Sequence, residues 1–252
     1  MGIILETRGI VKKFGGLTAL SNVDIQIEEE QITGLIGPNG AGKTTLFNVL
    51  SGFINPERGS VLYKKRRLEN LNSHKIVGLG VARTWQGLRL FGNLTVLENV
   101  FMAFPQKYSH NPIRLFLYSW EKNLSRREQA REILSLVKMQ DKADTTVNHL
   151  SYAEQKLVAI ARLVATEAEV LLFDEPTSGL DEKTVKTLIL PLIKGLVERK
   201  NKTVCIVEHS IQLVFDICDT VFCLNEGQVL ASGAPEVLRE DKELNRIFFQ
   251  MD

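Results

Sequence analysis

Residues 37–44, Gly-Pro-Asn-Gly-Ala-Gly-Lys-Thr, match the phosphate-loop pattern G-x-x-x-x-G-K-[ST] at every fixed position. They follow a short apolar run at 31–36 and precede helical apolar spacing over 43–50, which is the strand–loop–helix context that the pattern needs. Glycines let successive backbone N–H groups wrap around phosphate oxygens at the helix N-terminus. Lys43 would neutralise the β- and γ-phosphates, and the Thr44 hydroxyl would bind Mg²⁺. The segment therefore predicts a nucleoside triphosphate site.

Two carboxylates follow a second apolar run, Val-Leu-Leu-Phe at 170–173. Open α/β sheets bind ligands at the carboxyl ends of their strands, so Asp174 is placed to hold Mg²⁺ through water. Glu175 points to the other side and could orient or deprotonate an attacking water. An apolar run before Asp-Glu is weak evidence alone, because many strands end in this way. Together with the phosphate loop, it favours nucleotide hydrolysis.

The elements that must position these groups change character along the chain. Short alternating stretches near the N-terminus predict antiparallel strands. Helical spacing with charged faces dominates the middle. Strands and helices then alternate, which predicts a parallel sheet with both faces covered. The antiparallel stretches are 3–10, 23–27 and 59–68; the middle helices are 95–104, 121–139 and 154–166; the alternating part has strands at 170–173, 203–207 and 220–224 and helices at 183–200 and 211–217.

We therefore expect an α/β protein in which a helical insertion interrupts a mostly parallel sheet. The catalytic α/β core, with its N-terminal antiparallel part, is predicted over 1–88 and 159–252, and the helical subdomain over 89–158. No internal repeat or flexible linker divides the chain, so these parts are expected to form one domain.

Composition excludes several classes of protein. The 252 residues carry Lys+Arg 31 against Asp+Glu 30, and a net charge of +1 gives no global attraction to nucleic acid. Cys205, Cys218 and Cys223 form no regular framework, and no further Cys or His cluster completes a metal site, so buried free thiols are expected. No run of about 18 apolar residues is present, so no segment is expected to span a bilayer.

The motifs occur in an order that resembles the ATP-binding-cassette (ABC) ATPases. Residues 150–162, starting Leu-Ser-Tyr-Ala-Glu-Gln, are similar to the family signature and its helix, and 174–181 are similar to the Mg-binding strand end and the loop after it. Gln86 occupies the place of the glutamine loop, His209 that of the switch histidine, and Phe14 that of the aromatic residue that stacks on adenine. The resemblance spans nearly the whole chain and implies the P-loop NTPase fold, ATP, Mg²⁺ and an ATPase activity.

The resemblance implies three sets of site residues. The catalytic set is Glu175, His209, Gln86 and Lys43; the nucleotide-binding set is Phe14, Gly37, Pro38, Asn39, Gly40, Ala41, Gly42, Lys43, Thr44, Thr45, Ser151, Ala153 and Asp181; the metal set is Thr44, Gln86 and Asp174. The other histidines, His74, His110 and His149, are interpreted as ordinary polar residues. Arg83 is left open between a solvated arginine and one that binds an acid or a partner.

The resemblance also implies that one chain cannot complete its own site. Two cassettes would face head to tail, so that Ser151 and the backbone N–H of Ala153 donate hydrogen bonds to the γ-phosphate on the partner cassette. The glycines and glutamine usual after Leu-Ser are replaced here by Tyr152, Ala153 and Glu154. Ala153 still supplies its N–H, whereas Tyr152 must find room away from the phosphate.

Residues 83–86, Arg-Thr-Trp-Gln, with 94–100 after them, are similar to the ATPase subunits of branched-chain amino-acid importers. This implies transmembrane permease partners, a solute-binding protein acting indirectly, no nucleic acid, and a peripheral position on the cytoplasmic face of the cell membrane. The alternatives are an exporter or lipid-extraction cassette and a non-transport cassette on ribosomes or DNA. A GTP switch is disfavoured because the sequence lacks the guanine-reading Asn-Lys-x-Asp motif: Asn201-Lys202 are followed by Thr203-Val204. A module that binds nucleotide without hydrolysis is disfavoured by Glu175 and His209.

Overall fold

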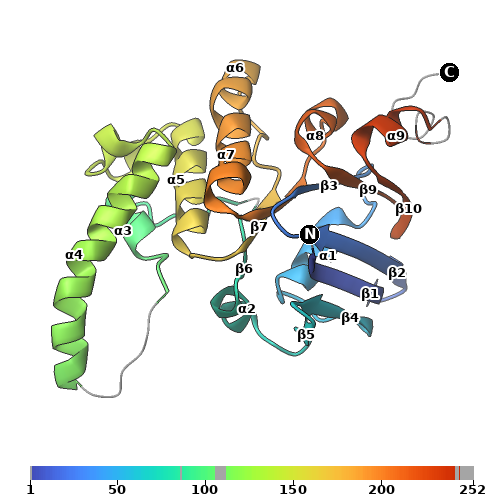
Figure 1. Ribbon diagram of the computed structural model, residues 1–252, viewed down its shortest axis with the longest axis horizontal. Coiled ribbons are helices and arrows are strands. Elements are labelled where there is room, and N and C mark those ends of the chain that lie inside the picture. The colour runs from blue at the N-terminus through green and yellow to red at the C-terminus, as the bar shows by residue number, and fades with distance from the viewer. Residues whose placement is uncertain (1, 86, 106–111, 242–243, 245–252) are drawn as a thin grey trace.

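Figure 1 shows two β-sheets at one end of the molecule and a helical part at the other. The structure is a computed structural model that describes residues 2–85, 87–105, 112–241 and 244, with the backbone alone for 112–123. The N-terminus lies beside the sheets, far from the helical part.

The larger sheet carries the two motif-bearing strands, with one strand between them. Its order within the described residues is β10-β9-β3-β8-β7-β6. Neighbouring strands from β9 to β6 are parallel, and β10 pairs antiparallel with β9. The mostly parallel sheet is therefore confirmed. Its strands are β3 (Ile32–Ile36), β6 (Val81–Arg83), β7 (Val170–Asp174), β8 (Thr203–Val207), β9 (Thr220–Asn225) and β10 (Gln228–Gly233).

A second sheet is antiparallel and comes from the N-terminal part of the chain, as expected. Its order is β2-β1-β4-β5. The long β1–β2 hairpin turns at Gly15 and Gly16, directly after Phe14. The strands are β1 (Ile3–Phe14), β2 (Leu17–Glu28), β4 (Arg58–Tyr63) and β5 (Arg66–Arg67).

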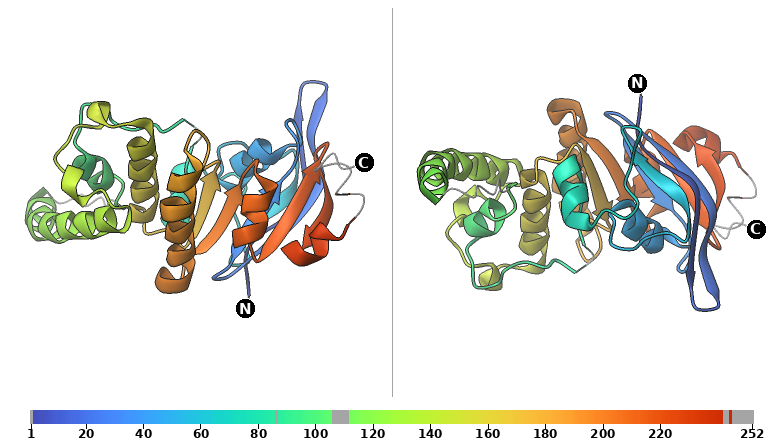
Figure 2. Two further views of the ribbon diagram at one scale, coloured as in Figure 1. Left: turned by 90° about the horizontal axis from the view of Figure 1, so that it is seen from above. Right: turned by 90° about the horizontal axis from the view of Figure 1, so that it is seen from below.

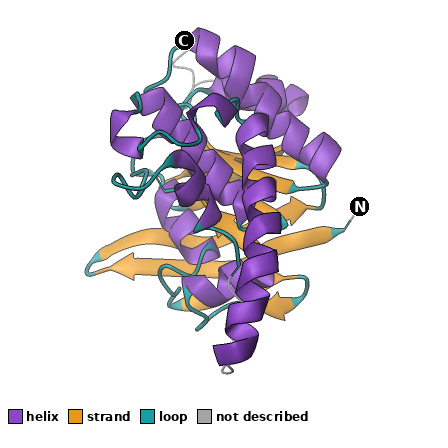
Figure 3. Ribbon diagram, turned by 90° about the vertical axis from the view of Figure 1, so that its left-hand side faces the viewer, coloured by secondary structure: helices purple, strands orange, loops and turns teal. Residues whose placement is uncertain are grey.

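Helices surround the larger sheet and extend away from it. Helix α1 (Lys43–Leu50) contacts both β2 and β7, so it packs between the two sheets. Figure 2 shows the helical part at the end opposite the antiparallel sheet, and Figure 3 views the molecule from that helical end, with strands behind. The other helices are α2 (Ser73–Leu79), α3 (Val96–Phe101), α4 (Pro112–Leu136), α5 (Tyr152–Ala165), α6 (Glu182–Thr184), α7 (Leu190–Lys200), α8 (Ile211–Ile217) and α9 (Pro235–Arg239), with short turns η1 (Gln140–Lys142), η2 (Val147–His149) and η3 (Val185–Ile189).

Side chains that alternate along the strands of the larger sheet pack into two separate apolar cores. On β7, Leu171 and Phe173 pack with the helical part, whereas Val170 and Leu172 pack with α1 and the antiparallel sheet. Strand residues buried on both faces are typical of a covered parallel sheet. The sheet is thus clamped from both sides, and the ends of its strands are held in fixed positions.

Three elements were not expected from the sequence: α2, β10 and α9. Helix α4 also begins at Pro112 rather than at residue 121. The division into 1–88, 89–158 and 159–252 stays a prediction, and its boundary at 158/159 falls inside α5. Within the described residues, no helix is long and apolar enough to cross a membrane.

Candidate active site

The loop before α1 is shaped by glycines. Gly40 and Gly42 have φ of 83° and 103°, values that disfavour side chains. A Cβ on Gly42 would lie 2.7 Å from the carbonyl oxygen of Ala19, so the loop packs directly on β2. Lys43 Nζ folds over the loop and donates to the carbonyl oxygens of Gly37 (2.6 Å) and Pro38 (3.0 Å). The loop therefore surrounds the lysine that should meet the phosphates.

A cleft of about 730 Å³ opens over this loop. It brings together ten of the residues that the sequence analysis proposed for nucleotide and catalysis. Phe14 lies at the cleft wall with 49% of its surface exposed, as a stacking residue requires. Those ten are Phe14, Asn39, Gly40, Ala41, Gly42, Lys43, Thr44, Thr45, Glu175 and His209.

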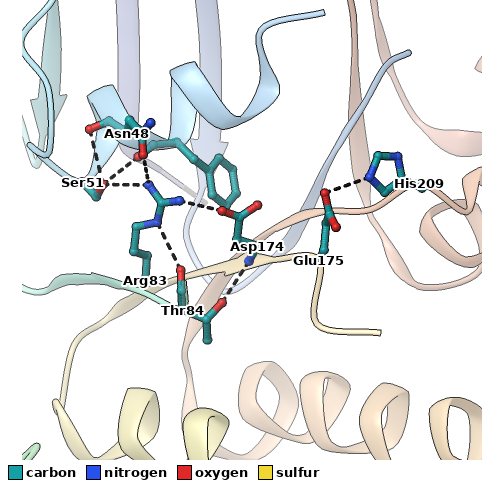
Figure 4. Close-up of polar contacts among 8 residues, drawn as sticks. Asn48, Ser51, Arg83, Thr84, Asp174, Glu175 and His209 are labelled. Carbon is teal, nitrogen blue, oxygen red and sulfur yellow. Dashed lines mark hydrogen bonds and ion pairs between the residues drawn. The ribbon is translucent and has the colours of Figure 1, made fainter. Parts of the chain in front are cut away.

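Glu175 sits at a tight corner directly after β7. Its φ is 49°, in the left-handed region that non-glycine residues rarely occupy, and its N–H donates to the carbonyl oxygen of Val207 on β8. Nε2 of His209 lies 2.8 Å from Oε1 of Glu175 and donates to it (Figure 4). A backbone held in an uncommon conformation at a candidate catalytic residue points to a functional reason for the corner.

Asp174 is held from two sides by residues that precede the glutamine loop. Its carboxylate Oδ2 accepts a hydrogen bond from Nη2 of Arg83 (2.6 Å), and its N–H donates to Oγ1 of Thr84 (3.0 Å) (Figure 4). Burial raises the pKa of Asp174, and Arg83 opposes that rise. Arg83, left open by the sequence, is therefore a buried partner of an acid and not a solvated residue.

The oxygen donors at this end of the sheet fit a magnesium ion. Mg²⁺ prefers carboxylate, hydroxyl and water oxygens, and Thr44 and Asp174 supply the first two. Asp174 and Glu175 both act electrostatically on Lys43, where they oppose the fall in its pKa that burial causes. The phosphate-binding lysine and the two acids thus converge on one place. Gln86, the third proposed metal residue, lies outside the described residues.

Three residues that the sequence analysis did not single out fix the segment after Glu175. Oε1 of Glu208 accepts hydrogen bonds from the N–H (2.8 Å) and the hydroxyl (2.7 Å) of Thr177. Lys156 of α5 donates to the carbonyl oxygens of Glu175 (3.0 Å) and Pro176 (3.3 Å). Both Glu208 and Lys156 are buried. Their roles depend on long-range contacts, which the sequence does not indicate. Only Glu208 could have been noticed from its position, because it directly precedes His209.

The signature residues do not line this cleft. Ser151 is the N-cap of α5 and is exposed; its hydroxyl donates to Oε2 of Glu154 (2.9 Å), whose own N–H points back to it (3.4 Å). Tyr152 is half exposed, and its ring lies against Gly179. Ala153 follows in the first turn of α5. The N–H groups of Ser151 and Glu154 are used within this helix start, which lies outside the cleft over the phosphate loop.

Asp181 likewise lies apart from the cleft, at the exposed start of α6. It accepts hydrogen bonds from the N–H (2.9 Å) and the hydroxyl (2.6 Å) of Thr184. These bonds lower the pKa of Asp181. The structure therefore brings together the phosphate loop, Glu175 and His209, and leaves Ser151, Ala153 and Asp181 outside.

Comparison with known proteins agrees with this geometry. Residues 20–178 match the family model described as "ABC transporter". The chain is 36% identical, over 97% of both chains, to the high-affinity branched-chain amino acid transport ATP-binding protein LivG of Salmonella typhimurium. A nucleotide-free ATP-binding cassette from an ABC transporter superposes with a TM-score of 0.84 at 30% identity, covering 98% of this chain and 99% of that one. A dimeric cassette bound to ADP and Pi superposes with a TM-score of 0.77 at 27% identity, covering 92% and 99%.

Proposed function

Because this chain belongs to the ABC transporter family of ATP-hydrolysing cassettes, we propose that it drives a membrane permease for branched-chain or other amino acids. The relative named for branched-chain amino acid transport matches 97% of the chain, so the likeness is not confined to the phosphate loop. The observation that carries the ATPase part is the convergence of Lys43, Glu175 and His209 on one cleft.

The residues of the cleft divide the work of hydrolysis. Lys43 and the N–H groups of the loop neutralise and hold the phosphates of ATP, with Phe14 against the adenine. Glu175 orients the attacking water and accepts its proton, and His209 holds the carboxylate through the 2.8 Å hydrogen bond. Thr44, Asp174 and Gln86 would hold Mg²⁺, which would neutralise charge on the phosphates when bound.

The second half of each site comes from another cassette. Ser151 is exposed, and neither Ser151 nor Ala153 lines the cleft, so they can reach the γ-phosphate of a second chain but not of their own. In a symmetric head-to-tail pair, each ATP site would combine the cleft of one chain with Ser151 and Ala153 of the other. A related cassette was solved as a dimer bound to ADP and Pi, which supports this assembly. Loss of the γ-phosphate removes these bonds and lets the pair reopen.

The cassette pair is proposed to act at the cytoplasmic face of the membrane, docked on transmembrane permease subunits, with a solute-binding protein delivering the substrate on the other side. Affinity purification of the chain from native membranes tests this. Co-purification of a permease with a solute-binding protein, together with amino-acid-stimulated ATPase activity after reconstitution, is expected. A permease without a solute-binding protein, and no stimulation by amino acids, would contradict the import role and leave the ATPase assignment intact.

A further inference from the structure

Arg83 is a buried cation whose side chain joins three elements that hold the nucleotide site. It ends β6 and is only 4% exposed, opposite Asp174, which is 2% exposed. Its guanidinium donates through Nη2 to Asp174 at the end of β7 and through Nη1 to Asn48 (2.7 Å) and Ser51 (3.2 Å) at the end of α1. Nε donates to the carbonyl oxygen of Thr84 (3.1 Å). Figure 4 shows these contacts converging on one side chain.

The contacts of Asp174 engage one of its two carboxylate oxygens. Arg83 occupies Oδ2, Thr84 holds the backbone N–H, and no described residue donates a hydrogen bond to Oδ1. Helix α1, anchored by Arg83 at one end, carries Lys43 and Thr44 at the other. The planar fork of an arginine presents donors in a fixed arrangement that can grip an acid and a second element at once, whereas a lysine offers a single rotatable ammonium group. Arg83 therefore sets the position of Asp174 relative to the phosphate loop.

The surroundings of the guanidinium confirm that it is fixed in place. It stacks on Trp85 with 4.4 Å between Cζ and the ring centroid, and on Phe47 with 5.7 Å. A buried charge persists only where partners satisfy it, and here hydrogen bonds leave every donor atom of Arg83 engaged. By contrast, Arg89 stacks on the same Trp85 at 3.9 Å, and no described contact joins it to Asp174.

We propose that Arg83 is a positioning residue for ATP hydrolysis, which orients the Asp174 carboxylate against α1 so that Oδ1 can hold the metal. The inference rests on the proposed ATPase function. Partners of metal ligands typically change metal affinity or activity about 10- to 100-fold when removed. Charge and position act in opposite directions here. Removing a positive charge beside Asp174 favours a cation, whereas releasing the carboxylate from its fixed orientation disfavours it. The sign of the change therefore identifies which effect Arg83 exerts.

The test compares Arg83→Met with Arg89→Met in the full chain. ATP binding in EDTA should stay within about twofold of the unsubstituted chain, because Arg83 does not line the cleft. Mn²⁺, which takes the same oxygen ligands, is then titrated by electron paramagnetic resonance on ATP-loaded chains that also carry Glu175→Gln. Its dissociation constant should rise about tenfold or more in Arg83→Met. Arg83→Lys should lie between, and Arg89→Met should match the unsubstituted chain.

Metal binding that is unchanged or tighter in Arg83→Met would overturn the inference. If Arg83→Met does not fold, Asn48→Ala serves instead, since it removes the shorter of the two links from Arg83 to the end of α1 and keeps the bond to Asp174. A weaker shift of the same sign supports the inference, and none contradicts it. The unsubstituted chain must hydrolyse ATP with Mg²⁺ in the same preparation. Absence of that activity would refute the proposed function, whereas normal activity with an unaffected Arg83→Met refutes only the role of Arg83.

Discussion

The residues at the cleft over the phosphate loop and the exposed residues outside it, Ser151 and Asp181, are held in different ways. Asp174 is buried and bonded to Arg83, and Glu175 is bonded to His209; both partners come from other parts of the chain. Ser151 and Asp181 are exposed N-cap residues. Each is hydrogen-bonded to a residue three positions later in its own helix, Glu154 and Thr184 respectively. Groups that act on the chain's own nucleotide are thus fixed by tertiary structure. Groups proposed to act on a neighbour's nucleotide are fixed locally and left at the surface.

This difference has a consequence for Ser151. Its hydroxyl donates to Glu154 in the structure, so it must turn to donate to a phosphate. The N–H groups of Ser151 and Glu154 are used in the same cap, although a helix N-terminus still favours an anion. In the cleft, Lys43 Nζ likewise donates to carbonyl oxygens of its own loop, so side chains of both halves must exchange contacts to meet a phosphate.

The largest expected effect is on the catalytic carboxylate. Glu175→Gln keeps the shape of the side chain and removes its ability to accept a proton, so ATP hydrolysis should fall by about 100-fold or more. Turnover is measured with saturating Mg-ATP, and size-exclusion chromatography should show a dimer that persists with ATP. An unchanged turnover rate would remove Glu175 from the mechanism.

The next effect concerns the lysine of the phosphate loop. Lys43→Ala removes a charge-assisted contact to the phosphates, so ATP affinity should fall by about tenfold or more. Equilibrium binding of a fluorescent ATP analogue measures it, with Lys75→Ala as the control, since Lys75 is exposed on α2 and does not line the cleft. Normal affinity in Lys43→Ala would contradict the phosphate-loop assignment.

Ser151→Ala tests whether the exposed serine acts on the nucleotide of a partner and not on that of its own chain. This change removes one donor to the partner's phosphate, and loss of a hydrogen bond to a charged group predicts a turnover rate about tenfold lower. Binding of ATP to the single chain should not change, because Ser151 lies outside its own cleft. Weaker binding by the isolated chain would show that Ser151 serves its own site.

A smaller effect is expected at Tyr152. Its ring lies against Gly179 and beneath Lys156, whose Nζ is 5.6 Å from the ring centroid, so it packs away from the helix start. Tyr152→Gly should change turnover by about twofold or less and lower thermal stability slightly, since glycine weakens a helix by about 1 kcal/mol. A large rise in turnover would instead identify Tyr152 as a brake on the signature contact.

Much of the fold and the cleft could be predicted because the signals are local. The phosphate loop, Asp174 and Glu175 are each defined by neighbours in sequence, and the alternation of strands and helices predicts the parallel sheet. Strand β10 was missed because its apolar residues, 229–231, are consecutive and do not alternate with polar ones, and because it is stabilised by pairing with β9.

Arg83 shows what a sequence cannot supply. Its burial depends on β6 lying beside β7, with Arg83 opposite Leu172, and on α1 ending nearby. Those partners are 32 to 91 residues away in the chain. Lys156 and Glu208 were missed for the same reason. Long-range pairing decides whether a charged residue is solvated or holds a site together.

The most direct measurement tests whether one chain seals the nucleotide of another. Chains carrying Glu175→Gln and Asn39→Cys are mixed with chains carrying Glu175→Gln and Ser151→Cys, and treated with a short bismaleimide linker. The native thiols should not interfere, because all three are buried and burial raises the pKa of Cys205 to about 12. Cross-linked pairs should form in the mixture with ATP, and neither without ATP nor from either chain alone. A stable ATP-bound dimer that gives no cross-link in the mixture would contradict the account.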